Sequence, residues 1–97
     1  MRKFSDVKGE EALDVLAEII VPITALANDE EVRKGMEVNV ANCVAIALKK
    51  YKTEIIDIIT AVNGKSKKET LKELDLLTLP AYFGDILSNP TIQSLFR

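Results

Sequence analysis

Apolar residues recur every three or four positions along almost the whole chain, and this spacing restricts the fold more than any other feature. An α-helix turns once in about 3.6 residues, so the spacing gathers apolar side chains on one face that needs to be buried. The isoleucine-rich segment "EIIDIIT" could also suit a strand, but its apolar residues repeat every three positions and no hairpin partner lies nearby. The pattern therefore predicts an all-α fold.

The first helix is expected to carry one buried stripe and to bend near its middle. Pro22 falls inside the apolar pattern, where a proline removes one backbone hydrogen bond and clashes with the preceding turn. We therefore expect a kink or a break at Ile19 to Val21. The stripe predicted to face inward comprises Leu13, Leu16, Ala17, Ile20, Ile23 and Ala27.

Capping residues divide the rest of the chain, giving a bundle of five to six helices in total. Asn28 or Asp29 can cap a second helix, whose stripe continues from Val32 to Tyr51. Asn63 and Gly64 can end a third helix in the left-handed conformation. The later signals are the capping-box pair Ser66 and Glu69 before inward Leu71, Leu74 and Leu77, Pro80 in the first turn of a fifth helix, and Asn89 with Pro90 before a last short helix.

The length of 97 residues suits a single domain spanning 1–97, near the small end of what can hold a core. The net charge of -2 offers no electrostatic footprint for nucleic acid. The apolar windows are too short or interrupted to cross a bilayer, so no membrane association is expected. Cys43 is the sole cysteine and lies in an apolar run, which favours a buried thiol and a reducing cytoplasm.

Polar clusters in the sequence give no support for an enzyme, a metal or a cofactor. Histidine is absent, which removes the commonest general base, and the scattered glycines build no phosphate-binding loop. The carboxylates spaced four apart on the first helix could hold a hard cation, but a solvated acidic face is the simpler interpretation. The lysines could form a phosphate patch or merely end one helix and decorate a turn. These two sets are Glu10, Asp14 and Glu18, and Lys49, Lys50, Lys52, Lys65, Lys67 and Lys68.

The last twenty residues, 78–97, form the densest aromatic region of the chain. Their apolar side chains either complete this protein's own core or form a more mobile segment that binds a partner. Packing inward is the default for so short a chain, whereas Gly84, "SNP" and the terminal position favour a partner-binding segment. The candidate contact residues are Leu79, Tyr82, Phe83, Ile86, Leu87, Ile92, Leu95 and Phe96.

The order of these segments resembles a known family. "FSDVKGEEALDVLAEIIVPI", "ANDEEVR", "LKKYKTEIIDIITAVNG" and "LTLPAYFGDILSNPTIQSLF" together resemble the small tail assembly chaperones of siphophages and prophages of Gram-positive bacteria. The likeness spans nearly the whole chain and rests on segments such as "KGEEALDVLAEI" and "DILSNPTIQSLF", not on a catalytic motif.

The resemblance implies a non-enzymatic chaperone of the bacterial host cytoplasm that binds the long helical tape measure protein and keeps it soluble while tail tube subunits polymerise. It also implies self-association around the client and contact with the tail tube protein, and it carries over no residue-level site. The alternative is another helical protein-interaction adaptor or a small regulatory, DNA-associated protein. Salt-dependent retention on nucleic acid would distinguish the regulator from a chaperone.

Overall fold

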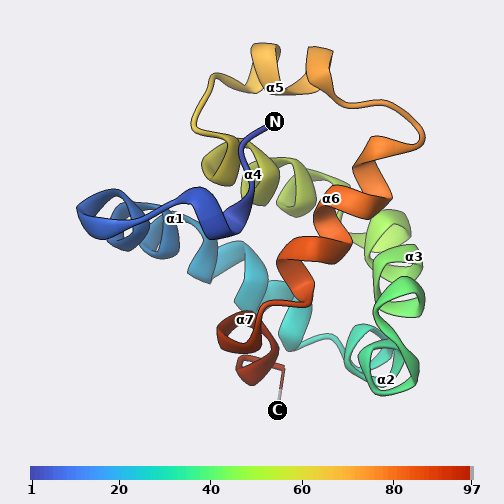
Figure 1. Cartoon of the computed structure of the whole chain (residues 1–97). Helices are drawn as coiled ribbons and strands as arrows, with labels where there is room; N and C mark the ends of the chain where they lie inside the picture. Colours follow the sequence, from blue (N-terminus) through green and yellow to red (C-terminus); the bar gives the residue numbers. More distant parts are fainter. Residues whose placement is uncertain (97) are drawn as a thin grey trace.

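The computed structural model describes residues 1–96, which contain seven α-helices, one short 3-10 turn and no strand. The all-α prediction is confirmed, with one helix more than the upper number expected. In chain order the elements are a 3-10 turn (Phe4–Asp6), α1 (Gly9–Ala27), α2 (Glu30–Val38), α3 (Val40–Lys50), α4 (Lys52–Asn63), α5 (Lys67–Glu73), α6 (Thr78–Leu87) and α7 (Pro90–Ser94) (Figure 1).

The additional helix arises at Asn39, where the predicted second helix divides into α2 and α3. Asn39 is extended, with φ −171° and ψ 166°, and its Oδ1 accepts a hydrogen bond from the backbone N–H of Asn42 at 2.7 Å. Asparagine is among the best N-cap residues, so this local bond competes with helix continuation. The prediction of one continuous helix was wrong because the apolar spacing carries on through a residue that caps.

The core draws most of its large buried side chains from α1, α4 and α6, and α6 runs diagonally across the centre of the view in Figure 1. Each of these helices contributes large side chains that are completely buried. Burial of apolar area is the main favourable term in folding, at about 25 cal/mol per Å². The fully buried set from these helices is Ile19, Ile23, Leu26, Ile55, Ile58, Ile59, Val62, Phe83, Ile86 and Leu87.

Helix α1 buries part of the predicted stripe, since Ile23 and Ala27 are buried and Leu16 packs against the core, but its inward face is shifted from the predicted one. Val15, Ile19 and Ile23 are buried, whereas Leu13 is 68% exposed and Ile20 is 42% exposed. The sequence of α1 is apolar on more than one side, so two stripes share the same helical spacing and only packing against α4 selects between them. The helix also runs through Pro22 without a break, and the kink at this residue stays a prediction.

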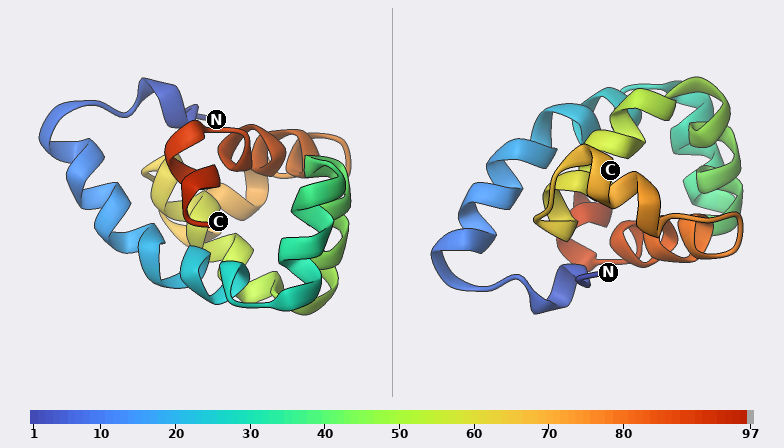
Figure 2. Two further views of the ribbon diagram at one scale, coloured as in Figure 1. Left: turned by 90° about the horizontal axis from the view of Figure 1, so that it is seen from below. Right: turned by 90° about the horizontal axis from the view of Figure 1, so that it is seen from above.

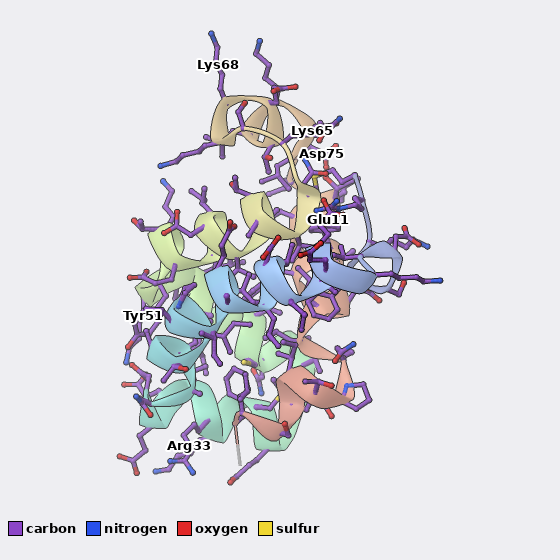
Figure 3. The ribbon with its side chains drawn as sticks, turned by 90° about the vertical axis from the view of Figure 1, so that its left-hand side faces the viewer. Glu11, Arg33, Tyr51, Lys65, Lys68 and Asp75 are labelled. Carbon is purple, nitrogen blue, oxygen red and sulfur yellow. The ribbon has the colours of Figure 1, made fainter. Side chains whose placement is uncertain are left out.

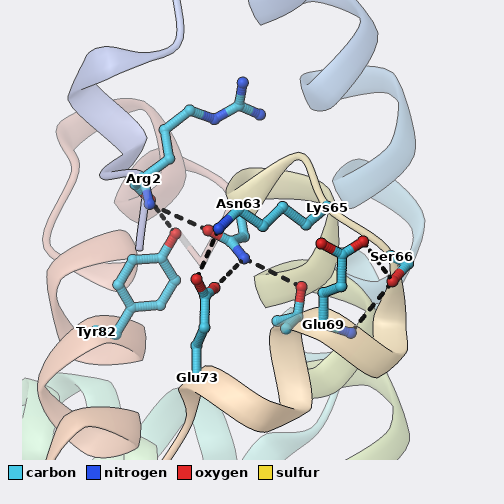
Figure 4. A network of polar contacts seen from close by, with 8 residues as sticks. Arg2, Asn63, Lys65, Ser66, Glu69, Glu73 and Tyr82 are labelled. Atoms are coloured by element: carbon cyan, nitrogen blue, oxygen red, sulfur yellow. Dashed lines mark hydrogen bonds and ion pairs between the residues drawn. The ribbon is translucent and has the colours of Figure 1, made fainter.

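A cluster of polar contacts fastens the N-terminal residues and α5 to the body of the protein (Figure 4). Buried Asn63 accepts a hydrogen bond from the backbone N–H of Arg2 at 3.1 Å and donates to Thr70 at 3.2 Å and to Glu73 at 2.8 Å. Lys65 pairs with Glu73 at 2.7 Å, and this pairing lowers the pKa of the Glu73 carboxyl.

The leucines predicted to lie inward in this region do so only in part, because Leu74 is half-buried against the core whereas Leu71 and Leu77 are not. The α5 side chain that is fully buried is Thr70, while Leu71 is exposed and Leu77, beyond the helix, is 84% exposed. Helix α5 ends at Glu73, so Leu77 falls in the loop before α6 rather than on an inward helical face. The capping prediction for Ser66 is confirmed, since its Oγ accepts from the backbone N–H of Glu69 at 3.1 Å.

Asp29 caps α2, as predicted, and links it to the end of α3. Its carboxylate accepts hydrogen bonds from the Tyr51 hydroxyl at 2.7 Å, from the Val32 backbone N–H at 3.1 Å and from Lys50 at 3.2 Å. These donors, with Tyr51 contributing most, lower the pKa of Asp29 from 3.8 to about 2. Tyr51 lies at the edge of the molecule on the face shown in Figure 3.

The Asp29 contacts predict a specific acid sensitivity. The folded-state pKa lies below the unfolded value of 3.8, so the unfolded chain takes up this proton first, and the stability gained above pH 3.8 is lost as pH falls towards about 2. We expect the difference in unfolding free energy between the wild type and Asp29→Asn to shrink across that window in urea titrations. A difference that stays constant from about pH 5 to about pH 2 would contradict these contacts.

Candidate functional site

The structure places the eight predicted contact residues against the protein's own core. Five of them are buried, namely Phe83, Ile86, Leu87, Ile92 and Phe96. The others, Leu79, Tyr82 and Leu95, are half-buried and pack against the same cluster. In this conformation most of their apolar surface is already used inside the molecule.

One long-range hydrogen bond and one helix cap hold this C-terminal segment in place. The Tyr82 hydroxyl donates a hydrogen bond to the backbone carbonyl of Arg2, and burial raises the pKa of that phenol to about 12. Asn89 caps α7, accepting from the backbone N–H groups of Thr91 and Ile92 at 2.9 and 3.4 Å. The last helices are thus part of the folded body.

An open apolar groove lies between α3 and α6. The groove encloses about 470 Å³ and is lined by no charged side chain. Three of its eight lining residues are alanines and Gly84 has no side chain, so little side-chain bulk fills the groove. We call it the α3–α6 groove, and its lining residues are Val40, Ala41, Val44, Ala45, Leu48, Pro80, Ala81 and Gly84.

The dimensions and chemistry of this groove suit an apolar helix. Small residues on a helix surface allow another helix to approach closely, because the distance between helix axes follows the side chains at the contact. An amphipathic helix that binds in a groove presents apolar anchor residues at spacings of three and four positions. Because the walls of this groove are uncharged, binding such a helix would not bury an unpaired charge. The α3–α6 groove therefore favours an apolar helical stripe over a charged or polar ligand.

A second apolar surface adjoins the groove where α5 leads into α6. Leu76 is 89% exposed and Leu77 is 84% exposed, which is unusual for two consecutive leucines. Beside them a hollow of about 350 Å³ opens between α5 and the α3–α4 corner, and Leu48 lines both this hollow and the α3–α6 groove. We call this the leucine surface, comprising Leu48, Ile56, Leu71, Leu74, Leu76, Leu77 and Leu79.

The remaining polar candidates are dispersed or engaged locally. Among residues 1–96 no three His, Cys, Asp or Glu side chains are grouped so as to hold a metal ion. Lys50 pairs with Asp29 and Glu31, and Lys65 pairs with Glu73, whereas Lys68 projects away from α5 (Figure 3). No helix in the described part of the chain has the length and apolar character required to cross a membrane.

Cys43 is buried, as expected, and burial raises the pKa of its thiol to about 11. At neutral pH almost all of this group is the protonated thiol, which is a poor nucleophile. The Ser66 hydroxyl donates to Glu69, that of Ser88 to the Gly84 carbonyl, and that of Ser94 to the Thr91 carbonyl. Each of these three serines lies at the end of a helix, where its hydroxyl forms a local hydrogen bond.

The α3–α6 groove was missed in the sequence because its two walls come from segments about forty positions apart. One signal was present: "VANCVAIAL" places Ala41 and Ala45 four positions apart, where an alanine stripe allows another helix to approach. Comparisons of the chain with protein-family models, curated proteins and solved structures give no match.

Proposed function

We propose that this protein is a non-enzymatic tail assembly chaperone that binds a phage tape measure protein in the bacterial host cytoplasm and keeps it soluble during tail tube assembly. The observation that carries the proposal is the uncharged α3–α6 groove, which is open to solvent in a chain of only 97 residues. The resemblance of the sequence to tail assembly chaperones supplies the identity of the client.

The mechanism follows from the chemistry of the groove. A tape measure protein is a long helix with exposed apolar stripes, and the groove can cover a short length of such a stripe. One short contact is weak, so several copies along the client would together hold it in solution. Weak individual contacts also allow release, because tail tube subunits that compete for the same client displace the copies one at a time.

The position of the eight C-terminal residues refines this proposal. Their side chains support the wall of the groove from inside, since Phe83, Ile86 and Leu87 lie on the same helix as Pro80, Ala81 and Gly84. The client contact is thus assigned to the outer face of α6 and the adjacent face of α3. A helical adaptor for another partner would use the same groove. The experiment below distinguishes the two by identifying the partner.

The proposal is tested by co-expression with overlapping segments of a phage tape measure protein. We expect at least one segment that is insoluble alone to remain soluble and to co-purify, with several copies of the chaperone per client measured by light scattering. A client variant whose apolar stripe is replaced by glutamine serves as the control and should not bind. A folded protein that leaves every segment insoluble, or that is retained on nucleic acid in a salt-dependent manner, would contradict the proposal.

A further inference from the structure

Helix α5 packs only lightly on the rest of the molecule. Thr70 is its buried residue, and the other residues of the helix are exposed. Figures 1 and 2 show α5 at the outside of the molecule, joined to α4 and α6 by a loop at each end. A helix of seven residues is not stable by itself, so α5 depends on the contacts that attach it to α4.

Hydrogen bonds from the end of α4 hold this helix. The side-chain amide of Asn63 donates to the Thr70 hydroxyl at 3.2 Å and to the Glu73 carboxylate at 2.8 Å. The backbone N–H of Arg2 donates to Oδ1 of Asn63 at 3.1 Å, which directs the amide N–H groups of Asn63 towards α5 (Figure 4). Asn63 is only 4% exposed, so a single buried amide joins the N-terminal residues, α4 and α5.

The backbone leaves the helical conformation on each side of α5. Before the helix, Gly64 has a left-handed φ of 73°, and after it Leu74 is extended, with φ −86° and ψ 137°. The next residue, Asp75, already belongs to the start of α6, because its carboxylate accepts hydrogen bonds from the backbone N–H groups of Leu77 and Thr78. Residues 66–74 can therefore move about their two ends while the start of α6 keeps its contacts.

We propose that residues 66–74 form a lid over the hollow of the leucine surface, and that this lid opens as one unit while the core stays folded. The Asn63 amide is its latch, and opening replaces the two latch bonds by bonds to water. The lid buries Thr70 completely and Leu74 in part, whereas the core comprises the fully buried side chains of α1, α4 and α6. Opening the lid therefore costs much less free energy than unfolding the whole chain.

An open lid enlarges the apolar surface beside the α3–α6 groove. Leu71 and Leu74 of the lid line one side of the hollow, and Leu48 and Leu79 of the folded body line the other. Leu48 also lines the α3–α6 groove, so the surface that the lid leaves behind is continuous with that groove. In the proposed function this lengthens the client stripe that one copy can cover, and that consequence alone rests on the proposed function. The lid is measured without a client, so either can fail by itself.

Native-state hydrogen exchange at increasing urea concentration tests the lid amide by amide. We expect the amides of residues 70–73 to exchange at least about a hundredfold faster than core amides of α1 and α4, at a rate that barely depends on urea. Core amides exchange through global unfolding, whose free energy falls steadily with urea. Amides of α5 that follow the urea dependence of the core, or that show no protection at all, would overturn the proposal.

Two variants separate the lid from the core. Ile19 is completely buried in α1, and Ile19→Val removes a methylene from the closed and the open form alike. Core amides should then exchange about fivefold faster, while α5 amides keep the wild-type rate. Asn63→Ala removes the latch from the closed form alone, so it should accelerate exchange of α5 about tenfold, and of the core by the same factor. Faster exchange of α5 in Ile19→Val, or a wild-type rate of α5 in Asn63→Ala, contradicts the lid.

A milder pair of variants on α5 itself controls for loss of the buried Asn63. Glu73→Gln weakens the charge-assisted latch bond and should accelerate exchange of α5 about threefold. Lys68→Gln is the matched control, because it also replaces a charged α5 side chain by glutamine. Lys68 projects away from α5 (Figure 3) and forms no ion pair among residues 1–96, so this variant should exchange like the wild type. Equal acceleration in both variants would point to a general charge effect and overturn the latch.

Discussion

Replacing Phe83 with alanine is expected to lower the free energy of unfolding by about 3–5 kcal/mol. Phe83 is completely buried in α6 within the central cluster, so the change removes a large apolar side chain and leaves a cavity. The total free energy of unfolding of a domain of this size is only about 5–15 kcal/mol, so the substitution removes a large fraction of it. Urea titration followed by circular dichroism measures the loss.

The control for this prediction is Leu77→Ala, three residues before Pro80 and 84% exposed. Its effect on the free energy of unfolding should stay within about 0.5 kcal/mol, since little apolar area is lost from the core. If instead Phe83→Ala kept the wild-type stability and lost only client binding, the aromatic segment would be a partner surface and not part of the core.

The second large effect is expected in the groove. Ala45→Glu places a carboxylate on the exposed floor of the α3–α6 groove, where a bound apolar helix would bury it without a partner. We expect the dissociation constant for a monomeric client peptide to rise by about a hundredfold, equivalent to about 2.7 kcal/mol, with the unfolding transition unchanged. Isothermal titration calorimetry on a peptide from a solubilised tape measure segment provides the measurement.

The same substitution at another exposed alanine, Ala17→Glu in α1, is the matched control. This site lies outside the groove, so the affinity for a single peptide should remain that of the wild type. Equal loss of affinity in both variants would indicate a general charge effect, and unchanged affinity in Ala45→Glu would move the client away from the α3–α6 groove.

Helix ends could be predicted from the sequence because their causes are local. Asp29, Ser66 and Asn89 each accept a hydrogen bond from a backbone N–H two or three positions further on, and Gly64 adopts the left-handed φ of 73° that ends α4. Such bonds depend only on neighbouring residues. Asn39 belongs to the same class, but the apolar spacing continues through it, and that spacing alone predicts one continuous helix.

The inward faces and the binding surfaces could not be predicted in the same way. In α1 the stripe containing Leu13 and the stripe containing Ile19 have the same spacing, and the choice between them depends on α4, which begins at Lys52. The α3–α6 groove exists only because residues 40–48 meet residues 80–84. The eight candidate contact residues stand out in the sequence by their aromatic density. In a small chain, clustered aromatic side chains are usually buried in the chain's own core.

The single buried thiol, Cys43, allows the rate of local opening to be measured. Cys43 lies on α3 beside Val44, which lines the α3–α6 groove, and a Cβ at Gly35 of α2 would come within 3.3 Å of the Cys43 backbone. Because this thiol is buried, a thiol reagent can reach its sulfur only when the structure around α3 opens, so the labelling rate reports how often that opening occurs. Opening of the structure around α3, which forms one wall of the groove, can therefore be timed in the native protein without any introduced probe.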